Sequence, residues 1–214
     1  MKVTVKERAE KIMAVFQRLN PHPATELVFA TPWQLLVAAV LSAQSTDKQV
    51  NKVTERLFQE CPGPREMAAL SEAELAEKIK SLGLYRTKSR NLLATARIIM
   101  EKYAGEVPRT REELEQLPGV GRKTANVVLA NAFNIPALAV DTHVFRVANR
   151  IGLAKAKTPE ATEAQLTRLL PEEQWKDAHH WLILHGRYTC TARNPKCAGC
   201  PIASYCDYLQ EKRE

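Results

Sequence analysis

The sequence predicts an all-α protein with about ten short helices. Apolar residues recur at helical spacing along most of the chain, and no stretch alternates convincingly between apolar and polar residues. The 214 residues are 45% hydrophobic, which suffices to bury a core in one or two domains. No internal repeat or low-complexity tract interrupts the pattern, so we expect helices joined by short loops.

Two helices are predicted near the N-terminus. The first has apolar positions at i, i+3, i+4 spacing and ends at Asn20-Pro21, because proline cannot continue a helix. Thr31 is a typical N-cap, and Pro32 suits the first position of the helix that follows. That helix, residues 33–41, is apolar on nearly all sides, and we therefore expect it at the centre of the fold.

Start and stop signals continue through the middle of the chain. Serine or threonine followed three residues later by glutamate matches the capping box, which satisfies backbone N–H groups at a helix start. The pattern occurs at Ser71 with Glu74 and at Thr110 with Glu113. Gly83 and Gly105 follow apolar-periodic stretches and are expected to end helices.

A glycine-containing turn joins two helical segments, 110–117 and about 122–133. Pro118 ends the first segment, and Gly119 and Gly121 allow backbone conformations that a side chain would forbid. The N–H groups of such a turn and the positive end of the next helix can bind one phosphate. The run predicts a helix-hairpin-helix that grips DNA without reading its sequence, although glycine-containing αα-turns also serve as plain connections.

An apolar run at 135–140 leads to Asp141, which is expected to cap a helix over 142–150. The positive end of that helix keeps the carboxylate ionised. An ionised carboxylate can also stabilise developing positive charge or move protons, so capping and catalysis are compatible at Asp141.

Four of the five cysteines close a C-terminal loop with the spacing Cys-x6-Cys-x2-Cys-x5-Cys. They are Cys190, Cys197, Cys200 and Cys206. Four thiolates suit zinc or an iron–sulfur cluster, and the absence of the paired Cys-x2-Cys spacing of zinc ribbons favours [4Fe–4S]. Two disulfides are disfavoured, because the chain can bury its own core and shows no secretory signal peptide.

The chain is basic, with a formal net charge of +7, which favours a polyanionic partner such as nucleic acid. Residues 78–102 hold seven Lys and Arg residues against one acid, Glu101. A solvated helix face is the ordinary interpretation of such a run. No apolar run approaches the ~20 residues of a membrane-spanning helix, so we expect a soluble intracellular protein without a membrane partner.

Five segments together resemble the endonuclease III branch of the helix-hairpin-helix DNA glycosylases. They are Leu-Ser-Ala-Gln-Ser-Thr-Asp at 41–47, Gly-Leu-Tyr at 83–85, Leu-Pro-Gly-Val-Gly-Arg-Lys-Thr-Ala at 117–125, Val-Asp-Thr-His at 140–143 and the cysteine group at 190–206. The resemblance covers nearly the whole chain, and no motif position that the family uses for chemistry departs from its pattern.

The resemblance implies two helical domains flanking a DNA-binding cleft. One is a six-helix barrel over 25–135 that contains the helix-hairpin-helix at about 110–133. The other joins 1–24 to 136–214 and carries a [4Fe–4S] cluster on the four cysteines. Enzymes of this family flip oxidised pyrimidines out of duplex DNA, cleave the glycosidic bond and then nick the strand at the resulting AP site.

The resemblance makes Lys123 and Asp141 the catalytic residues. Lys123 lies at the start of a helix, where the positive helix end disfavours the ammonium form, and burial in a cleft would do so further. A free amine is a nucleophile. In the family it adds to sugar C1′, expels the base and forms a Schiff base, after which β-elimination cleaves the 3′ side of the site.

The resemblance and the loop positions also predict a set of DNA-binding residues: Gln44, Leu84, Gly119, Val120, Gly121, Arg122, His143, Arg193 and Lys196. Gln44 and Leu84 match residues that fill the space of the flipped base and wedge the opposite strand. Arg193 and Lys196 lie inside the cysteine loop, where a cluster would hold them against phosphate. Ordinary packing remains the rival interpretation for Gln44, Leu84 and His143.

Two other classes fit part of the pattern. One is a non-catalytic DNA-binding module with a metal knot; the other is a monofunctional adenine or mismatched-thymine glycosylase. Relatives of the second class lack a lysine at the position of Lys123, and the adenine branch usually carries a further C-terminal domain. We therefore expect the bifunctional enzyme, as a monomer. No targeting extension precedes the first helix, which suits a bacterial or archaeal cytoplasm, with the protein at the nucleoid.

Overall fold

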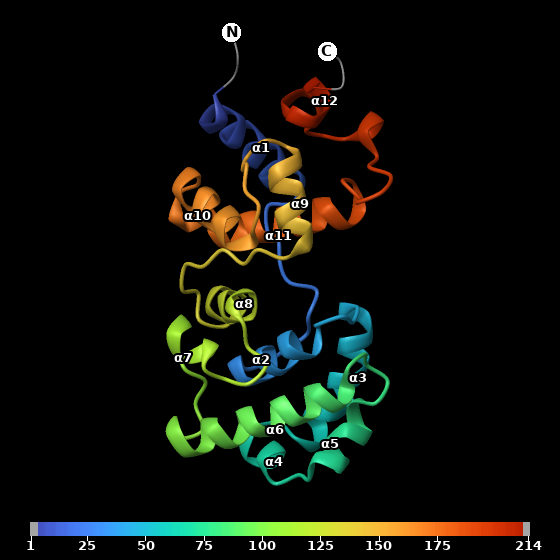
Figure 1. The fold of residues 1–214 in the computed structure, drawn as a ribbon, viewed down its shortest axis with the longest axis vertical. Helices are drawn as coiled ribbons and strands as arrows, with labels where there is room; N and C mark the ends of the chain where they lie inside the picture. Colours follow the sequence, from blue (N-terminus) through green and yellow to red (C-terminus); the bar gives the residue numbers. More distant parts are fainter. Residues whose placement is uncertain (1–3, 212–214) are drawn as a thin grey trace. The chain divides into compact units, whose positions relative to one another are not determined.

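The computed structural model describes residues 4–211. Within that range the chain forms twelve α-helices and three short 3₁₀-helices and contains no strand (Figure 1). The predicted all-α fold class is confirmed. None of the described helices is both long and apolar enough to cross a membrane.

The chain divides into two compact units, and Thr25–Ile135 forms the first. Its seven helices are α2 (Pro32–Leu41), α3 (Asp47–Glu60), α4 (Pro64–Ala68), α5 (Glu72–Ile79), α6 (Tyr85–Lys102), α7 (Arg111–Glu115) and α8 (Arg122–Ala132). Every residue of α2 except Pro32 and Gln34 is buried, and α2 contacts α3, α6 and α8. The nearly uniform apolar sequence of α2 explains this central position, as predicted.

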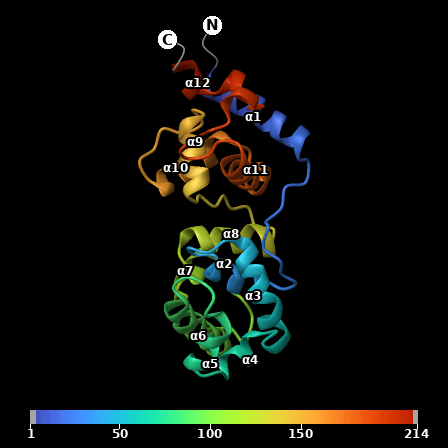
Figure 2. The same ribbon diagram turned by 90° about the vertical axis from the view of Figure 1, so that its right-hand side faces the viewer.

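The second unit joins the chain before Thr25 to the chain from Pro136 onward. Its helices are α1 (Val5–Leu19), α9 (Thr142–Arg150), α10 (Pro159–Leu169), the 3₁₀-helix η1 (Glu172–Gln174), α11 (Trp175–Tyr188), the 3₁₀-helices η2 (Cys197–Gly199) and η3 (Ala203–Tyr205), and α12 (Asp207–Glu211). Figure 2 shows α1 and α12 side by side at one end of this unit. The apolar face of α1 shares one core with α9 and α11, and the Trp181 indole N–H donates to the Asn20 carbonyl oxygen at 2.9 Å.

Most helix starts follow the predicted caps. Thr31 accepts a hydrogen bond from the Gln34 N–H, and Ser71 with Glu74 forms a complete capping box. Gly83 is an exception to our expectation. Helix α5 ends at Ile79 with Lys80 as its C-cap, and Gly83 does not have the positive φ of a glycine helix stop. Gly83 instead allows its own turn and the turn of Gln44 to approach each other closely.

Candidate active site and nucleic-acid interface

Helices α7 and α8 are the two helices of the predicted hairpin, and α6 holds the turn between them. Gly119 has a φ of +79°, and a Cβ at this position would lie 2.8 Å from the amide nitrogen of Asn91 on α6. One turn further along α6, the Thr95 hydroxyl donates to the Pro118 carbonyl oxygen at 3.0 Å. Glycine is therefore required at 119 both by its conformation and by close packing.

Gly121 is different, and here our expectation was wrong. Its φ of −99° is accessible to any residue, so the conformation does not need glycine. Among the described residues, no heavy atom beyond its chain neighbours lies within 4 Å of the place where a Cβ would be. The start of α8 thus faces open space, where a ligand can approach backbone N–H groups at the positive end of the helix.

Lys123 is the second residue of α8, directly after this turn, and its side chain is half-buried. Arg122 before it is exposed. Both residues make further interactions within the protein. The hairpin therefore places a lysine amine in the first turn of a helix, beside a turn suited to phosphate.

Asp141 caps α9, as predicted, and accepts a hydrogen bond from the Val144 N–H at 2.8 Å. His143 lies half-buried in the same first turn, and its Nδ1 is 3.3 Å from Nη2 of Arg146. Lys123 and Asp141 belong to different units. Their pairing in one active site remains a prediction.

Gln44 and Leu84 lie on two turns that meet in the unit Thr25–Ile135. Both are exposed and both have left-handed backbone conformations, with φ of 53° and 57°. Such conformations are strained for residues with side chains, and strained residues cluster at active sites and ligand clamps. A Cβ on Gly83 would lie 3.2 Å from the Gln44 carbonyl oxygen, so glycine at 83 permits the close approach. The structure thus brings Gln44 and Leu84 together.

The four cysteines line one pocket together with Arg150 and His185. All four are free thiols; Cys190 and Cys206 are buried, and Cys197 and Cys200 are half-buried. The thiols line this pocket rather than converge on a point. No group of three or more His, Cys, Asp or Glu residues between 4 and 211 is arranged to hold a single metal ion. Four cysteines that line one pocket are the ligand set of an iron–sulfur cluster.

Burial raises the pKa of the Cys200 and Cys206 thiols, and the neighbouring cysteine sulfurs add to the shift. A bound metal centre overrides this shift, because a coordinating thiol is deprotonated by the metal. The Cys200 and Cys206 thiols therefore favour the protonated form only as long as they ligate no metal.

Arg150, the last residue of α9, makes several polar contacts with the cysteine loop. Its guanidinium donates to the Thr191 carbonyl oxygen at 2.8 Å and to the Ala192 carbonyl oxygen at 3.2 Å. It also lies 3.5 Å from the Cys190 sulfur, and its own carbonyl oxygen lies 4.0 Å from the Cys206 sulfur. One residue of α9 thus contacts the first and the last cysteine of the loop.

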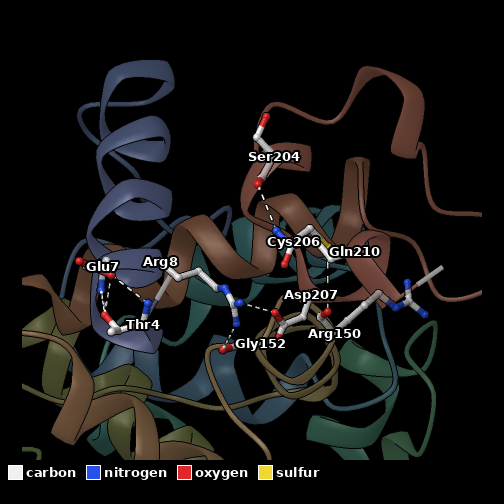
Figure 3. A network of polar contacts seen from close by, with 9 residues as sticks. All are labelled: Thr4, Glu7, Arg8, Arg150, Gly152, Ser204, Cys206, Asp207 and Gln210. Carbon is white, nitrogen blue, oxygen red and sulfur yellow. Dashed lines mark hydrogen bonds and ion pairs between the residues drawn. The ribbon is translucent and has the colours of Figure 1, made fainter. Parts of the chain in front are cut away.

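The N-terminal helix is fastened to the same region (Figure 3). Arg8 of α1 forms an ion pair with Asp207, the residue after Cys206, and donates to the Gly152 carbonyl oxygen at 3.2 Å. Gly152 has a φ of +79°, and a Cβ there would overlap both the Asp207 carboxylate and the Arg8 guanidinium. We name Arg8, Gly152 and Asp207 the clasp.

Arg193 and Lys196 are exposed on the cysteine loop, and the Lys196 N–H donates to the Thr189 carbonyl oxygen at 2.9 Å. Arg150 donates hydrogen bonds to the same loop at Thr191 and Ala192. Arg150 was not predicted to support this loop. Its only sequence signal was its place in the last turn of a predicted helix, where a cation is favourable.

Comparison with known proteins now decides the family. Residues 37–172 match the HhH-GPD superfamily base excision DNA repair protein family, and residues 190–206 match the iron-sulfur binding domain of endonuclease III. The chain is 51% identical to endonuclease III of Rickettsia conorii over 92% of this chain and 94% of that protein. This chain belongs to the endonuclease III family. It is a base excision repair enzyme, a DNA glycosylase and AP lyase, and it carries a [4Fe–4S] cluster, as predicted.

Other members of the endonuclease III family are similarly close. Endonuclease III of Escherichia coli is 48% identical over 96% of this chain and 98% of its own. The solved structure of a trapped endonuclease III–DNA covalent intermediate has a TM-score of 0.93 and 43% identity and covers both chains completely. A non-covalent endonuclease III–DNA complex also has a TM-score of 0.93 at 43% identity, with 99% of each chain covered.

Proposed function

We propose that Lys123 and Asp141 are the catalytic residues of this enzyme and that its substrates are oxidised pyrimidines in duplex DNA. The observation that carries the proposal is the position of Lys123. It follows the phosphate-binding turn directly and sits half-buried in the first turn of α8, where the positive helix end favours the free amine.

The chemistry assigned to Lys123 proceeds in two stages. Its uncharged amine attacks C1′ of the flipped nucleotide; a C–N bond forms, and the bond from C1′ to the base breaks. The base leaves with the bonding electrons and takes a proton. Opening of the sugar ring gives a protonated Schiff base, which acidifies the C2′ proton. Loss of that proton and rupture of the C3′–O3′ bond nick the strand by β-elimination, and water then releases the lysine.

Asp141 is assigned the electrostatic and proton-transfer part of this reaction. Its carboxylate is held at the start of α9 by the Val144 N–H and stabilises positive charge that develops on the sugar. Asp141→Asn keeps an oxygen that can accept the same capping bond. This variant should therefore fold normally and lose most glycosylase activity, and a variant with the full rate would refute the assignment.

The remaining predicted residues are assigned to DNA. Gln44 and Leu84 enter the duplex beside the flipped nucleotide, and Gly119, Val120, Gly121 and Arg122 bind phosphate at the start of α8. Arg193 and Lys196 contact phosphate from the cysteine loop, and His143 contacts phosphate or substrate. The ligands assigned to the cluster are Cys190, Cys197, Cys200 and Cys206. A bound cluster would link the four cysteines and so fix the shape of this loop. We further infer a monomer associated with the nucleoid.

The test is borohydride trapping on a duplex with one thymine glycol. The wild-type protein should form a covalent adduct with DNA, because borohydride reduces a Schiff base to a stable amine. Lys123→Ala should form none. An adduct that persists in Lys123→Ala would place the nucleophile elsewhere. Base release without any wild-type adduct would favour a monofunctional glycosylase.

A further inference from the structure

One face of α6 contacts every turn that we assign to DNA in the unit Thr25–Ile135. Leu84, Lys88, Asn91 and Thr95 are spaced i, i+4, i+7 and i+11, so they line one side of the helix over about 16 Å. Leu84 is the N-cap of α6 and a proposed inserting residue. Asn91 packs against Gly119, and Thr95 holds Pro118, so both support the hairpin turn.

Lys88 occupies the remaining position of this face, and its burial is unexpected. It belongs to the basic run 78–102, for which a solvated surface was predicted, but the residue is only 4% exposed. Its ammonium donates to the Ser45 hydroxyl at 3.0 Å. Among residues 4–211, no carboxylate lies within ion-pair distance of it.

Burial of the Lys88 ammonium in this arrangement destabilises the folded state. A buried ammonium without a carboxylate loses much of its hydration, and the first turn of a helix carries positive partial charge that repels it. Burial accordingly lowers the pKa of Lys88. An apolar side chain of similar length would fill the same volume without this cost, so the reason for a lysine lies in its single hydrogen bond.

That hydrogen bond fixes the turn that carries Gln44. Ser45 is the next residue after Gln44, and the bond joins it to α6 across 43 residues of sequence. The other polar contact of Ser45 is local, from its N–H to the Ser42 carbonyl oxygen at 3.2 Å. Lys88 thus links the strained Gln44 turn to α6, the helix whose N-cap is Leu84.

We propose that Lys88 is a positioning residue, and that with Asn91 and Thr95 it makes one face of α6 a rigid support. This support fixes Gln44 and Leu84 relative to the hairpin turn before DNA binds. The inference rests on the proposed function, in which Gln44 and Leu84 enter the duplex. It predicts that Lys88 matters where two strands must be separated and not where the AP site is already single-stranded.

The experiment compares Lys88→Met with wild type on two substrates under single-turnover conditions. Methionine fills most of the volume but cannot donate a hydrogen bond. On a thymine-glycol duplex, base release should slow roughly ten- to hundredfold, because a small misplacement of positioned groups has effects of this size. Strand cleavage of a single-stranded AP oligonucleotide should stay within about twofold of wild type. Lys102→Met, at the exposed end of α6, is the control and should match wild type on both substrates.

A second readout is independent of the chemistry. The fluorescence of 2-aminopurine opposite the lesion rises when the opposite strand is wedged apart, and Lys88→Met should lose most of this rise. This signal also separates the two proposals. If wild type wedges the duplex but forms no Schiff base, the assignment of Lys123 fails while Lys88 can still be tested.

Ser45→Ala removes the same hydrogen bond from the other side. It should slow duplex base release by roughly three- to tenfold, less than Lys88→Met because a water can replace the hydroxyl. The double variant should be no slower than Lys88→Met alone, since both changes remove one contact. Equal losses on duplex and single-stranded DNA, or wild-type duplex rates in Lys88→Met, would overturn the proposal. If Lys88→Met does not fold, an unchanged rate in Ser45→Ala would overturn it.

Discussion

Replacing Gly152 by alanine should open the clasp and weaken the hold of the protein on its cluster. Gly152 has a φ of +79°, and its new Cβ would overlap the Asp207 carboxylate and the Arg8 guanidinium. Both obstacles are ends of flexible side chains, so the protein can accommodate the methyl group by moving them apart. That movement separates the Arg8–Asp207 ion pair and breaks the hydrogen bond from Arg8 to the Gly152 carbonyl oxygen.

The loss in free energy of unfolding caused by Gly152→Ala has two parts. A left-handed conformation costs alanine roughly 1–2 kcal/mol more than glycine. The Arg8 and Asp207 side chains are only 10% and 21% exposed, so solvent screens their pairing weakly, and separating them should cost about 1–2 kcal/mol more. The unit that contains α1 and α12 should therefore lose roughly 2–4 kcal/mol in free energy of unfolding. Because Asp207 follows Cys206, the loss should reach the cluster.

The assay follows the visible absorbance of the cluster during incubation with a chelator and an oxidant, together with thermal unfolding by circular dichroism. Gly152→Ala should lose absorbance several-fold faster than wild type and unfold at a lower temperature. Gly199→Ala is the matched control. Gly199 lies within the cysteine loop, but no heavy atom of the described chain beyond its neighbours lies within 4 Å of its Cβ position. If Gly152→Ala and Gly199→Ala retain the cluster equally long, the clasp does not support it.

Three further predictions concern DNA binding and pH. Gly119→Ala should destabilise the protein by roughly 1–2 kcal/mol, whereas Gly121→Ala should leave thermal unfolding unchanged but weaken DNA binding, because its methyl group would occupy the proposed phosphate position. Arg193→Ala and Lys196→Ala should each lower the slope of log K against log salt by about one; unchanged slopes would remove them from the interface. Burial lowers the pKa of His180 to about 3, so between pH 6.5 and 3 the unfolded chain binds the extra proton. The stability contributed by His180 should then fall by roughly 1.4 kcal/mol per pH unit on acidification, and His180→Gln should flatten the stability profile.

Helix boundaries were predictable because their signals are local. Thr31, Ser71 and Asp141 each cap a helix with a side chain that accepts a bond from an N–H three residues ahead, so a few letters of sequence contain all the partners. Gly119 was predictable for a similar reason, since a proline before it ends one helix and another helix starts soon after. The extended conformation of Gly121 was not predictable, because the backbone conformation of this residue depends on contacts with residues outside the segment 117–125.

The clasp could not be predicted from the sequence. Arg8 and Asp207 lie near opposite ends of the chain, and each looks like an ordinary surface charge in its own helix. Their pairing depends on α1 reaching the core of α9 and α11, which is a property of the tertiary fold. The sequence around Gly152 likewise does not show whether glycine is needed there for close packing of side chains or only for a turn.

Lys88 shows a physical limit to predicting the buried face of a helix from the periodicity of apolar residues. Helical spacing identifies a buried face from apolar residues, and a polar residue at the same spacing counts against burial. A face that supports functional turns carries polar side chains, because turns present carbonyl and hydroxyl groups that need hydrogen-bond partners. Lys88 and Thr95 meet that need at Ser45 and Pro118, and both are buried. The rule that polar residues count against burial therefore fails on α6. It fails at the residues that we propose position the DNA-binding turns, where folding alone does not determine the choice of side chain.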